Sequence, residues 1–174
     1  MRVIGGEFRS RRLKSVPGEA TRPTPYRLRE TLFDILAPRI HDAPFVDAYA
    51  GTGAIGIEAL SRGAAHAFFL EKNRAALEAI RENLAALGLE RRATVLTGPA
   101  ALTMAPIVTP TSIVFADPPY RLEREYAAFL ETLAGNPPAL AIVQHSVRLA
   151  LPQASLKLVR DIRQGDNVLA FFEA

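Results

Sequence analysis

The amino-acid sequence predicts an α/β protein with a doubly wound, Rossmann-like sheet whose strands are mostly parallel and whose last strand is antiparallel. Three observations support this. Apolar strand-like runs alternate with amphipathic helical segments, a glycine-rich loop follows the first buried run, and two strand-like runs close the chain around a turn. The 174 residues, 49% of them hydrophobic, can bury one sizeable core. We therefore expect a single domain over residues 1–174.

The N-terminal part should precede the sheet as a basic arm, residues 1–24, and a helix. Residues 2–14 have the pattern of a β-hairpin or an extended arm, and residues 15–24 form a Pro/Gly loop. Thr24 is expected to cap a helix that has Pro25 at its first position and ends at Pro38. An apolar stripe along this helix comprises Leu28, Leu32, Ile35 and Leu36.

The core, within residues 25–174, should contain strands and helices in alternation. Parallel strands are expected at 45–49, 66–70, 93–96, 112–116 and 140–143, and the terminal antiparallel pair at 155–163 and 167–173. Helices are expected after the glycine loop, between Asn73 and Gly88, and at 123–134. Asn73 suits a helix N-cap and Gly88 a helix end.

The glycine loop Gly51-Thr52-Gly53-Ala54-Ile55-Gly56 suggests a ligand site. Glycines let the backbone approach a ligand closely, and the following helix offers unpaired N–H groups. Glu71 lies 20 residues after Gly51, which satisfies the dinucleotide-binding spacing, so a nicotinamide enzyme is a real alternative. Asp47 favours another ligand, because its negative carboxylate would repel the negative pyrophosphate of a dinucleotide. It suits S-adenosylmethionine, which carries a sulfonium and an ammonium group and no phosphate.

The tetrapeptide Asp117-Pro118-Pro119-Tyr120 follows a buried strand, at the edge of the sheet where ligands bind in such folds. Two prolines hold the chain extended and leave their carbonyl groups free to accept hydrogen bonds. An acid, a carbonyl and an aromatic ring on one rigid segment suit a flat ring that bears an amino group. Hydride transfer gives this segment no role, so the two motifs together favour a methyltransferase. A proline-stiffened turn that merely ends a strand is the structural alternative.

Composition excludes several kinds of chemistry. The chain has no cysteine, so disulfides, thiolate metal sites and a cysteine nucleophile are absent. Its three histidines have no metal-ligand spacing, and no metal is expected. No apolar run is long enough to cross a membrane, and the N-terminus lacks the pattern of a signal peptide. We expect a cytoplasmic monomer.

Charge is concentrated at the N-terminus. Residues 1–40 hold nine Lys/Arg against four Asp/Glu, a net charge of +5, whereas the remainder has a net charge of −2. This pattern favours a surface that binds a polyanion such as RNA over an ordinary solvated face. The candidate RNA contacts are Arg2, Arg9, Arg11, Arg12 and Arg22.

Over nearly its whole length the sequence resembles the RsmD family of class I methyltransferases. The resemblance includes the N-terminal segments Arg2-Val3-Ile4-Gly5-Gly6 and Arg22-Pro23-Thr24, which single out this family. It continues through 47–56, 58–64, Glu71 and 117–120. It implies a seven-stranded sheet, S-adenosylmethionine as methyl donor, and the exocyclic N2 of a guanine in 16S ribosomal RNA as target. The substrate would be an assembled or assembling small subunit.

The resemblance also implies roles for single residues. Asp117 and the Pro118 carbonyl would accept hydrogen bonds from the guanine amino group, and Tyr120 would stack on the base. The donor would be held by Asp47, the loop residues Gly51, Thr52 and Gly53, and Glu71, which would take the ribose hydroxyls. The sequence departs from the family at Ser10, usually glycine, at Tyr26, usually aspartate, and at Gly98-Pro99-Ala100. Many methyltransferases have an acid in that last segment, so backbone groups near Ala100 would have to contact the adenine.

Two further alternatives remain open. The same tetrapeptide serves methyltransferases that act on DNA adenine or on protein glutamine. A non-catalytic RNA-binding factor in ribosome assembly could also keep this fold.

Overall fold

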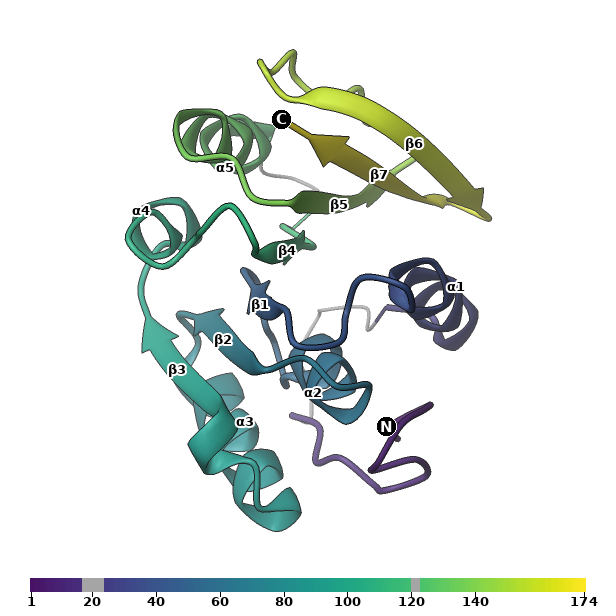
Figure 1. The fold of residues 1–174 in the computed structure, drawn as a ribbon, viewed down its shortest axis with the longest axis vertical. Coiled ribbons are helices and arrows are strands. Elements are labelled where there is room, and N and C mark those ends of the chain that lie inside the picture. Colours follow the sequence, from purple (N-terminus) through teal and green to yellow (C-terminus); the bar gives the residue numbers. More distant parts are fainter. Residues whose placement is uncertain (17–23, 120–122) are drawn as a thin grey trace.

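The computed structural model describes residues 1–16, 24–119 and 123–174. Seven strands form one sheet in the order β3-β2-β1-β4-β5-β7-β6 (Figure 1). Strands β1 to β5 are parallel, and β7 is antiparallel to both β5 and β6. The strands are β1 (Pro44–Asp47), β2 (His66–Glu71), β3 (Ala93–Thr97), β4 (Ile113–Ala116), β5 (Leu140–Ser146), β6 (Lys157–Gln164) and β7 (Asn167–Glu173). The predicted mixed sheet with its antiparallel C-terminal pair is confirmed.

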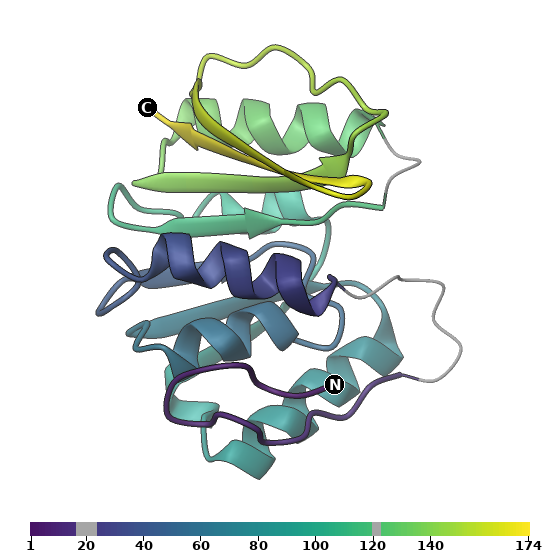
Figure 2. The same ribbon diagram turned by 90° about the vertical axis from the view of Figure 1, so that its right-hand side faces the viewer.

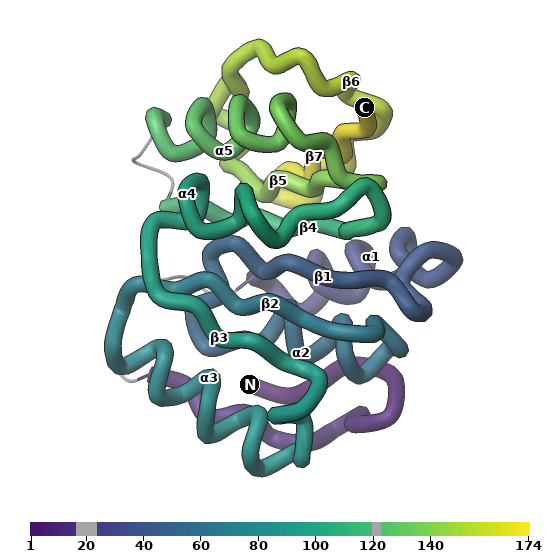
Figure 3. The backbone as a smooth tube through the Cα atoms, turned by 60° about the vertical axis from the view of Figure 1, so that its left-hand side comes forward, coloured from purple at the N-terminus to yellow at the C-terminus, as the bar shows by residue number. Residues whose placement is uncertain are grey.

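Helices cover both faces of this sheet. The helices are α1 (Tyr26–Leu36), α2 (Ala54–Ser61), α3 (Arg74–Leu87), α4 (Ala100–Met104) and α5 (Glu123–Gly135), with a 3-10 turn η1 (Glu90–Arg92). Helices α1, α2 and α3 share one core cluster with the N-terminal arm. Figure 2 views the molecule from this side, with α1, α2 and the arm in front of the sheet. Helices α4 and α5 pack on the opposite face (Figure 3).

The central strands β1 and β4 are mainly apolar because both faces of the sheet are buried there, whereas the edge strand β6 is polar and largely exposed. Along β1, the Phe45 side chain packs with α1, α2 and α3, whereas the next residue, Val46, packs with α4 and α5. On β4, Phe115 likewise packs on the face with α1, α2 and α3, and Val114 packs on the face with α4 and α5. This alternation follows from the two-residue period of a strand, and two covered faces produce near-continuous hydrophobic runs.

Most helix boundaries agree with the sequence prediction, with two corrections. Asn73 caps α3 by accepting a hydrogen bond from Ala76 N at 3.0 Å, and Gly88 ends the helix in the left-handed conformation. Thr24 is not the N-cap of α1, as was expected. Pro25 occupies that position, and the Thr24 hydroxyl donates to the Gln144 side chain at 3.2 Å. Helix α4 was not predicted.

The described part of the arm, residues 1–16, is a hairpin-like loop with an isolated β-bridge between Arg2 and Arg12 in place of regular strands. Ser10 lies in its turn with a φ of 69°, a left-handed conformation that favours glycine. The Ser10 N–H donates to the Val3 carbonyl at 2.9 Å and fixes the turn. Ser10, where the resemblance led us to expect glycine, therefore has a backbone conformation that is strained for serine.

Candidate functional site

The carboxyl ends of β1, β2 and β4 form the candidate site. The chain leaves β1 through α2 to reach β2 on one side, whereas β4 lies on the other side of β1. Such a reversal of strand order opens a crevice at the carboxyl edge of the sheet. Asp47 ends β1, Glu71 ends β2 and Asp117 directly follows β4.

Strand register places these three acids on one face. Asp47 is paired with Phe69 on β2 and with Phe115 on β4. Glu71 and Asp117 each lie two residues beyond those partners, and residues two apart in a strand face the same way. Glu71 and Asp117 therefore lie on either side of Asp47, on the face of the sheet that carries α1, α2 and α3.

Asp47 is 1% exposed, and its carboxyl group accepts a hydrogen bond from Gly56 N at 2.9 Å. Burial raises its pKa to about 7. The Gly56 N–H opposes this rise, whereas the Glu71 carboxylate adds to it. Asp47 thus holds the first turn of α2 against the end of β1. A ligand cation near it would favour its ionised form.

Asp117 has a similarly perturbed carboxyl group. Burial raises its pKa to about 8, and the neighbouring Asp47 contributes to the increase. Burial raises the pKa of both carboxyl groups, and Asp47 adds to the rise for Asp117, so the protein without a ligand disfavours having both of them ionised. Strongly perturbed carboxyl groups in a crevice mark a candidate functional site, here one suited to a cationic ligand.

The glycine loop connects β1 to α2 and is tied to Glu71. Glu71 Oε2 accepts from Gly51 N at 2.8 Å, and Oε1 accepts from Lys72 N and Asn73 N, also at 2.8 Å. Gly51 and Gly53 have φ values of 51° and 81°, and a Cβ atom on Gly51 would meet nothing within 4 Å. The loop therefore leaves open space beside its backbone, which is what close approach of a ligand requires.

The segment after β3 supplies no acidic side chain. Gly98 has a φ of 152°, and Pro99 is the N-cap of α4 without a side-chain hydrogen bond. Ala100 begins this helix and is buried. Any contact with a ligand here would have to come from backbone groups, as the sequence suggested.

The Asp-Pro-Pro segment differs from the prediction in one respect, because the Pro118 carbonyl is not free of partners. It accepts a hydrogen bond from the hydroxyl of Tyr126, a fully buried residue of α5, at 3.1 Å. A carbonyl oxygen has two lone pairs, so a second hydrogen bond remains possible. Tyr120 lies outside the described residues.

Sequence reasoning missed three side chains that brace this edge. Tyr126 anchors Pro118, and the Tyr49 hydroxyl, in the loop after β1, donates to Glu125 Oε2 at 2.8 Å. Burial and the contact with Glu125 raise the pKa of Tyr49, which keeps it a hydrogen-bond donor. These contacts join the ends of β1 and β4 to α5. Their sequence signal is weak, because Tyr49 directly precedes the short Ala50-Gly51 turn and Tyr126 follows the charged residues at the start of α5.

Backbone groups of the arm bind to side chains of α2. The backbone N–H groups of Ile4 and Gly5 donate to the Glu58 carboxylate, and Phe8 N donates to Ser61 Oγ. Because Ser61 is the last residue of α2, the turn of the arm lies at the end of this helix away from the glycine loop. Figure 2 shows the arm running along this face of the molecule.

Four of the arginines predicted to contact RNA lie on the surface of the arm. Arg2, Arg9, Arg11 and Arg12 are all exposed. The Arg2 guanidinium donates to Ser10 O at 3.2 Å, and that of Arg11 donates to Ala86 O at 3.3 Å. Four of the five predicted arginines are thus gathered on the arm, and Arg22 lies outside the described residues.

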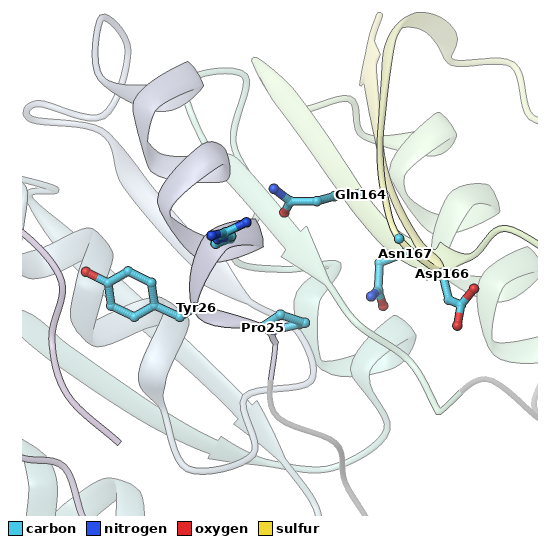
Figure 4. Close-up of a pocket in the computed structure, with 7 residues that line it drawn as sticks. Pro25, Tyr26, Gln164, Asp166 and Asn167 are labelled. Carbon is cyan, nitrogen blue, oxygen red and sulfur yellow. The ribbon is translucent and has the colours of Figure 1, made fainter.

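A shallow pocket of about 450 Å³ lies beside the acidic crevice rather than in it. Pro25, Tyr26 and Arg27 line one side, and residues 164–167 of the β6–β7 turn line the other (Figure 4). The pocket is at the carboxyl edge, because Asn167 pairs with Ser146 at the end of β5. Tyr26 is 58% exposed, so its ring is available for contact with a planar ligand.

Metal-ligand clusters and membrane-spanning helices are both absent from the part of the chain that the structure describes. In residues 1–16, 24–119 and 123–174, no cluster of three His, Asp or Glu side chains could hold a metal ion. No helix within the same ranges is long and apolar enough to span a membrane.

Comparison with known proteins identifies relatives over the full length of the chain. A family model described as Conserved hypothetical protein 95 matches residues 1–173. Ribosomal RNA small subunit methyltransferase D of Escherichia coli is 46% identical over 121 residues, which cover 70% of this chain and 61% of that protein. The chain thus matches less than two thirds of that relative's length.

Solved structures share the fold. The Escherichia coli protein yhhF has a TM-score of 0.85 at 39% identity, covering 99% of this chain and 97% of that one. A methyltransferase from Geobacter sulfurreducens has a TM-score of 0.66 at 16% identity, covering 86% and 79%. The expected class I methyltransferase fold is therefore confirmed.

Proposed function

Because the chain belongs to the family described as Conserved hypothetical protein 95, the RsmD family, we propose that it methylates the exocyclic N2 of a guanine in small-subunit ribosomal RNA. The methyl donor would be S-adenosylmethionine. The observation that carries this proposal is the position of Asp47, Glu71 and Asp117 together at the switch point of the sheet, with the rigid Pro118-Pro119 segment next to them.

The residues of the crevice fit this donor. When bound, it would supply an electrophilic methyl group on a positively charged sulfur. Asp47 and its acidic neighbours would favour the donor's cationic end, directly or through water. Gly51, Thr52 and Gly53 would contact it through the backbone, and Ala100 would do so near the adenine. Glu71 uses three of its roughly four acceptor positions on backbone N–H groups and would keep one for a ribose hydroxyl.

Asp117 and Pro118 would orient the guanine amino group. The lone pair of this nitrogen is delocalised into the ring, which makes it a poor nucleophile. Hydrogen bonds from its protons to the Asp117 carboxylate and the Pro118 carbonyl would direct the lone pair toward the methyl carbon. As the new N–C bond forms and the C–S bond breaks, Asp117 would accept a proton from the nitrogen. Tyr120 would stack on the base, and close in-line placement would supply much of the rate.

The basic arm would bind the RNA backbone. Arg2, Arg9, Arg11, Arg12 and Arg22 would neutralise phosphates, which fixes orientation without reading sequence. Since the arm extends to the far end of α2, the RNA would have to cross this whole face to reach both the arm and the crevice. A ribosomal subunit offers a surface of that extent.

A methyl-transfer assay tests the proposal. Small subunits from cells that lack the modification would be incubated with the protein and labelled S-adenosylmethionine, and their RNA would be digested to nucleosides. Label in N2-methylguanosine is expected. Donor binding without label in RNA would mean that the substrate is wrong, and DNA and protein would be tested next. Binding of NAD in place of S-adenosylmethionine would instead support a dehydrogenase.

A further inference from the structure

Asn83 joins the arm to the glycine loop. This residue of α3 is 4% exposed. Its Oδ1 accepts a hydrogen bond from Lys14 N at 2.7 Å, and its Nδ2 donates to Lys14 O and to Thr52 O, both at 3.1 Å. Lys14 lies near the end of the arm, and Thr52 lies between Gly51 and Gly53. One buried amide group therefore holds both segments.

The geometry of an amide makes this connection stiff. Its two N–H groups lie in one plane, and here one donates to the arm and the other to the loop. Rotation of the side chain to follow one segment would break its bond to the other. A buried polar group left without a partner is unfavourable, so the two segments should move together.

The rest of the arm is attached to the helix that the glycine loop begins. Glu58 and Ser61, both in α2, bind the backbone of residues 4, 5 and 8. The exposed Lys14 ammonium group also forms an ion pair with Glu82, at 2.5 Å, next to Asn83 in α3. The arm is thus attached at residues 4–8 and at Lys14 to elements that shape the donor site, and Asn83 makes the contact with the loop itself.

We infer that Asn83 is a positioning residue that couples RNA binding by the arm to donor binding by the glycine loop. This inference rests on the proposed function. RNA bound to the arm would hold Lys14 and the Asn83 amide in this arrangement, and through the amide the Thr52 carbonyl, so that the donor binds a loop already in place. By linkage, donor binding must strengthen RNA binding by the same factor.

Binding measurements with and without substrate test the coupling. The dissociation constant of labelled S-adenosylhomocysteine would be measured for the protein alone and with saturating small ribosomal subunits. We expect subunits to tighten binding at least about fivefold in the wild type, the lower end of typical coupling. In Asn83→Ala the ratio should be close to one.

Two variants serve as matched controls. Asn136→Ala removes another amide that donates to a backbone carbonyl, that of Val108 at 2.8 Å, on the opposite face of the sheet. Lys14→Ala removes a basic side chain and its ion pair but keeps the backbone groups that contact Asn83. Both should keep the wild-type ratio. The same ratio in Asn83→Ala as in these controls would refute the inference.

Hydrogen exchange provides a second readout that needs no RNA. Addition of S-adenosylhomocysteine should slow exchange of the Lys14 amide in the wild type and leave it unchanged in Asn83→Ala. A wild-type protein that methylates subunits but shows neither effect would overturn the coupling alone. A protein that does not bind the donor would overturn the proposed function and this inference together.

Discussion

Replacement of Asp117 by asparagine should make the ligand-free protein less sensitive to alkaline pH. Asparagine has nearly the same shape as aspartate but cannot ionise. In the wild type, burial and Asp47 raise the pKa of Asp117 from 3.8 to about 8. The folded state therefore binds a proton that the unfolded state has already released, and the free energy of unfolding falls as pH rises between about 4 and 8.

The size of the effect follows from this linkage. One raised acid lowers the free energy of unfolding by at most about 1.4 kcal/mol per pH unit in this window, or about 3 kcal/mol from pH 5.5 to pH 7.5. Asp117 is partly exposed, which reduces the cost of its ionisation. We therefore expect the free energy of unfolding of Asp117→Asn, relative to that of the wild type, to rise by roughly 1–3 kcal/mol from pH 5.5 to pH 7.5.

Urea unfolding at several pH values between 5.5 and 8.5 measures this difference. The quantity to follow is the free energy of unfolding of Asp117→Asn minus that of the wild type, so that other titrating groups cancel. Asp161→Asn, at an exposed position on β6, is the matched control and should parallel the wild type. A constant difference between Asp117→Asn and wild type across the range would refute the assigned environment of Asp117.

Three further predictions concern the arm and the loop. The double variant Arg9→Ala/Arg12→Ala should bind small subunits more weakly and with a shallower salt dependence, because fewer phosphates are neutralised; an unchanged slope in filter binding would mean that these side chains do not contact RNA. Gly56→Ala should lower the free energy of unfolding by about 3 kcal/mol, since its Cβ would lie 2.3 Å from the Phe69 ring; urea unfolding indistinguishable from wild type would contradict this packing. Ser10→Gly should raise the melting temperature modestly, by relief of about 1 kcal/mol of backbone strain; a lower melting temperature would show that the turn prefers serine.

The sequence was sufficient to predict where the strands lie and which acidic residues stand at their ends. Buried strands produce uninterrupted apolar runs, so each run located a strand, and Asp47, Glu71 and Asp117 stood out where the runs stopped. Parallel strands end at the same edge of the sheet, which brings these acids together whatever the helices do.

Features that depend on tertiary contacts could not be predicted. Helix α4 is five residues long and has neither a side-chain cap nor an acid in its first turn. The contact between Tyr126 and Pro118 depends on how α5 packs against the sheet. The bridge from Lys14 to Asn83 joins residues 69 positions apart in the chain. Thr24 had the sequence of an N-cap, but its hydroxyl donates instead to Gln144, on a strand distant in sequence.

The most direct test of the central claim compares methyl transfer by the wild type and by Asp117→Ala in a single turnover. Both proteins would be loaded with labelled S-adenosylmethionine, their donor dissociation constants measured, and small ribosomal subunits then added. If Asp117 orients the amino group and accepts its proton, transfer by the variant should be at least about 100-fold slower while donor binding is largely retained. Transfer at the wild-type rate would show that the crevice does not perform this reaction through Asp117.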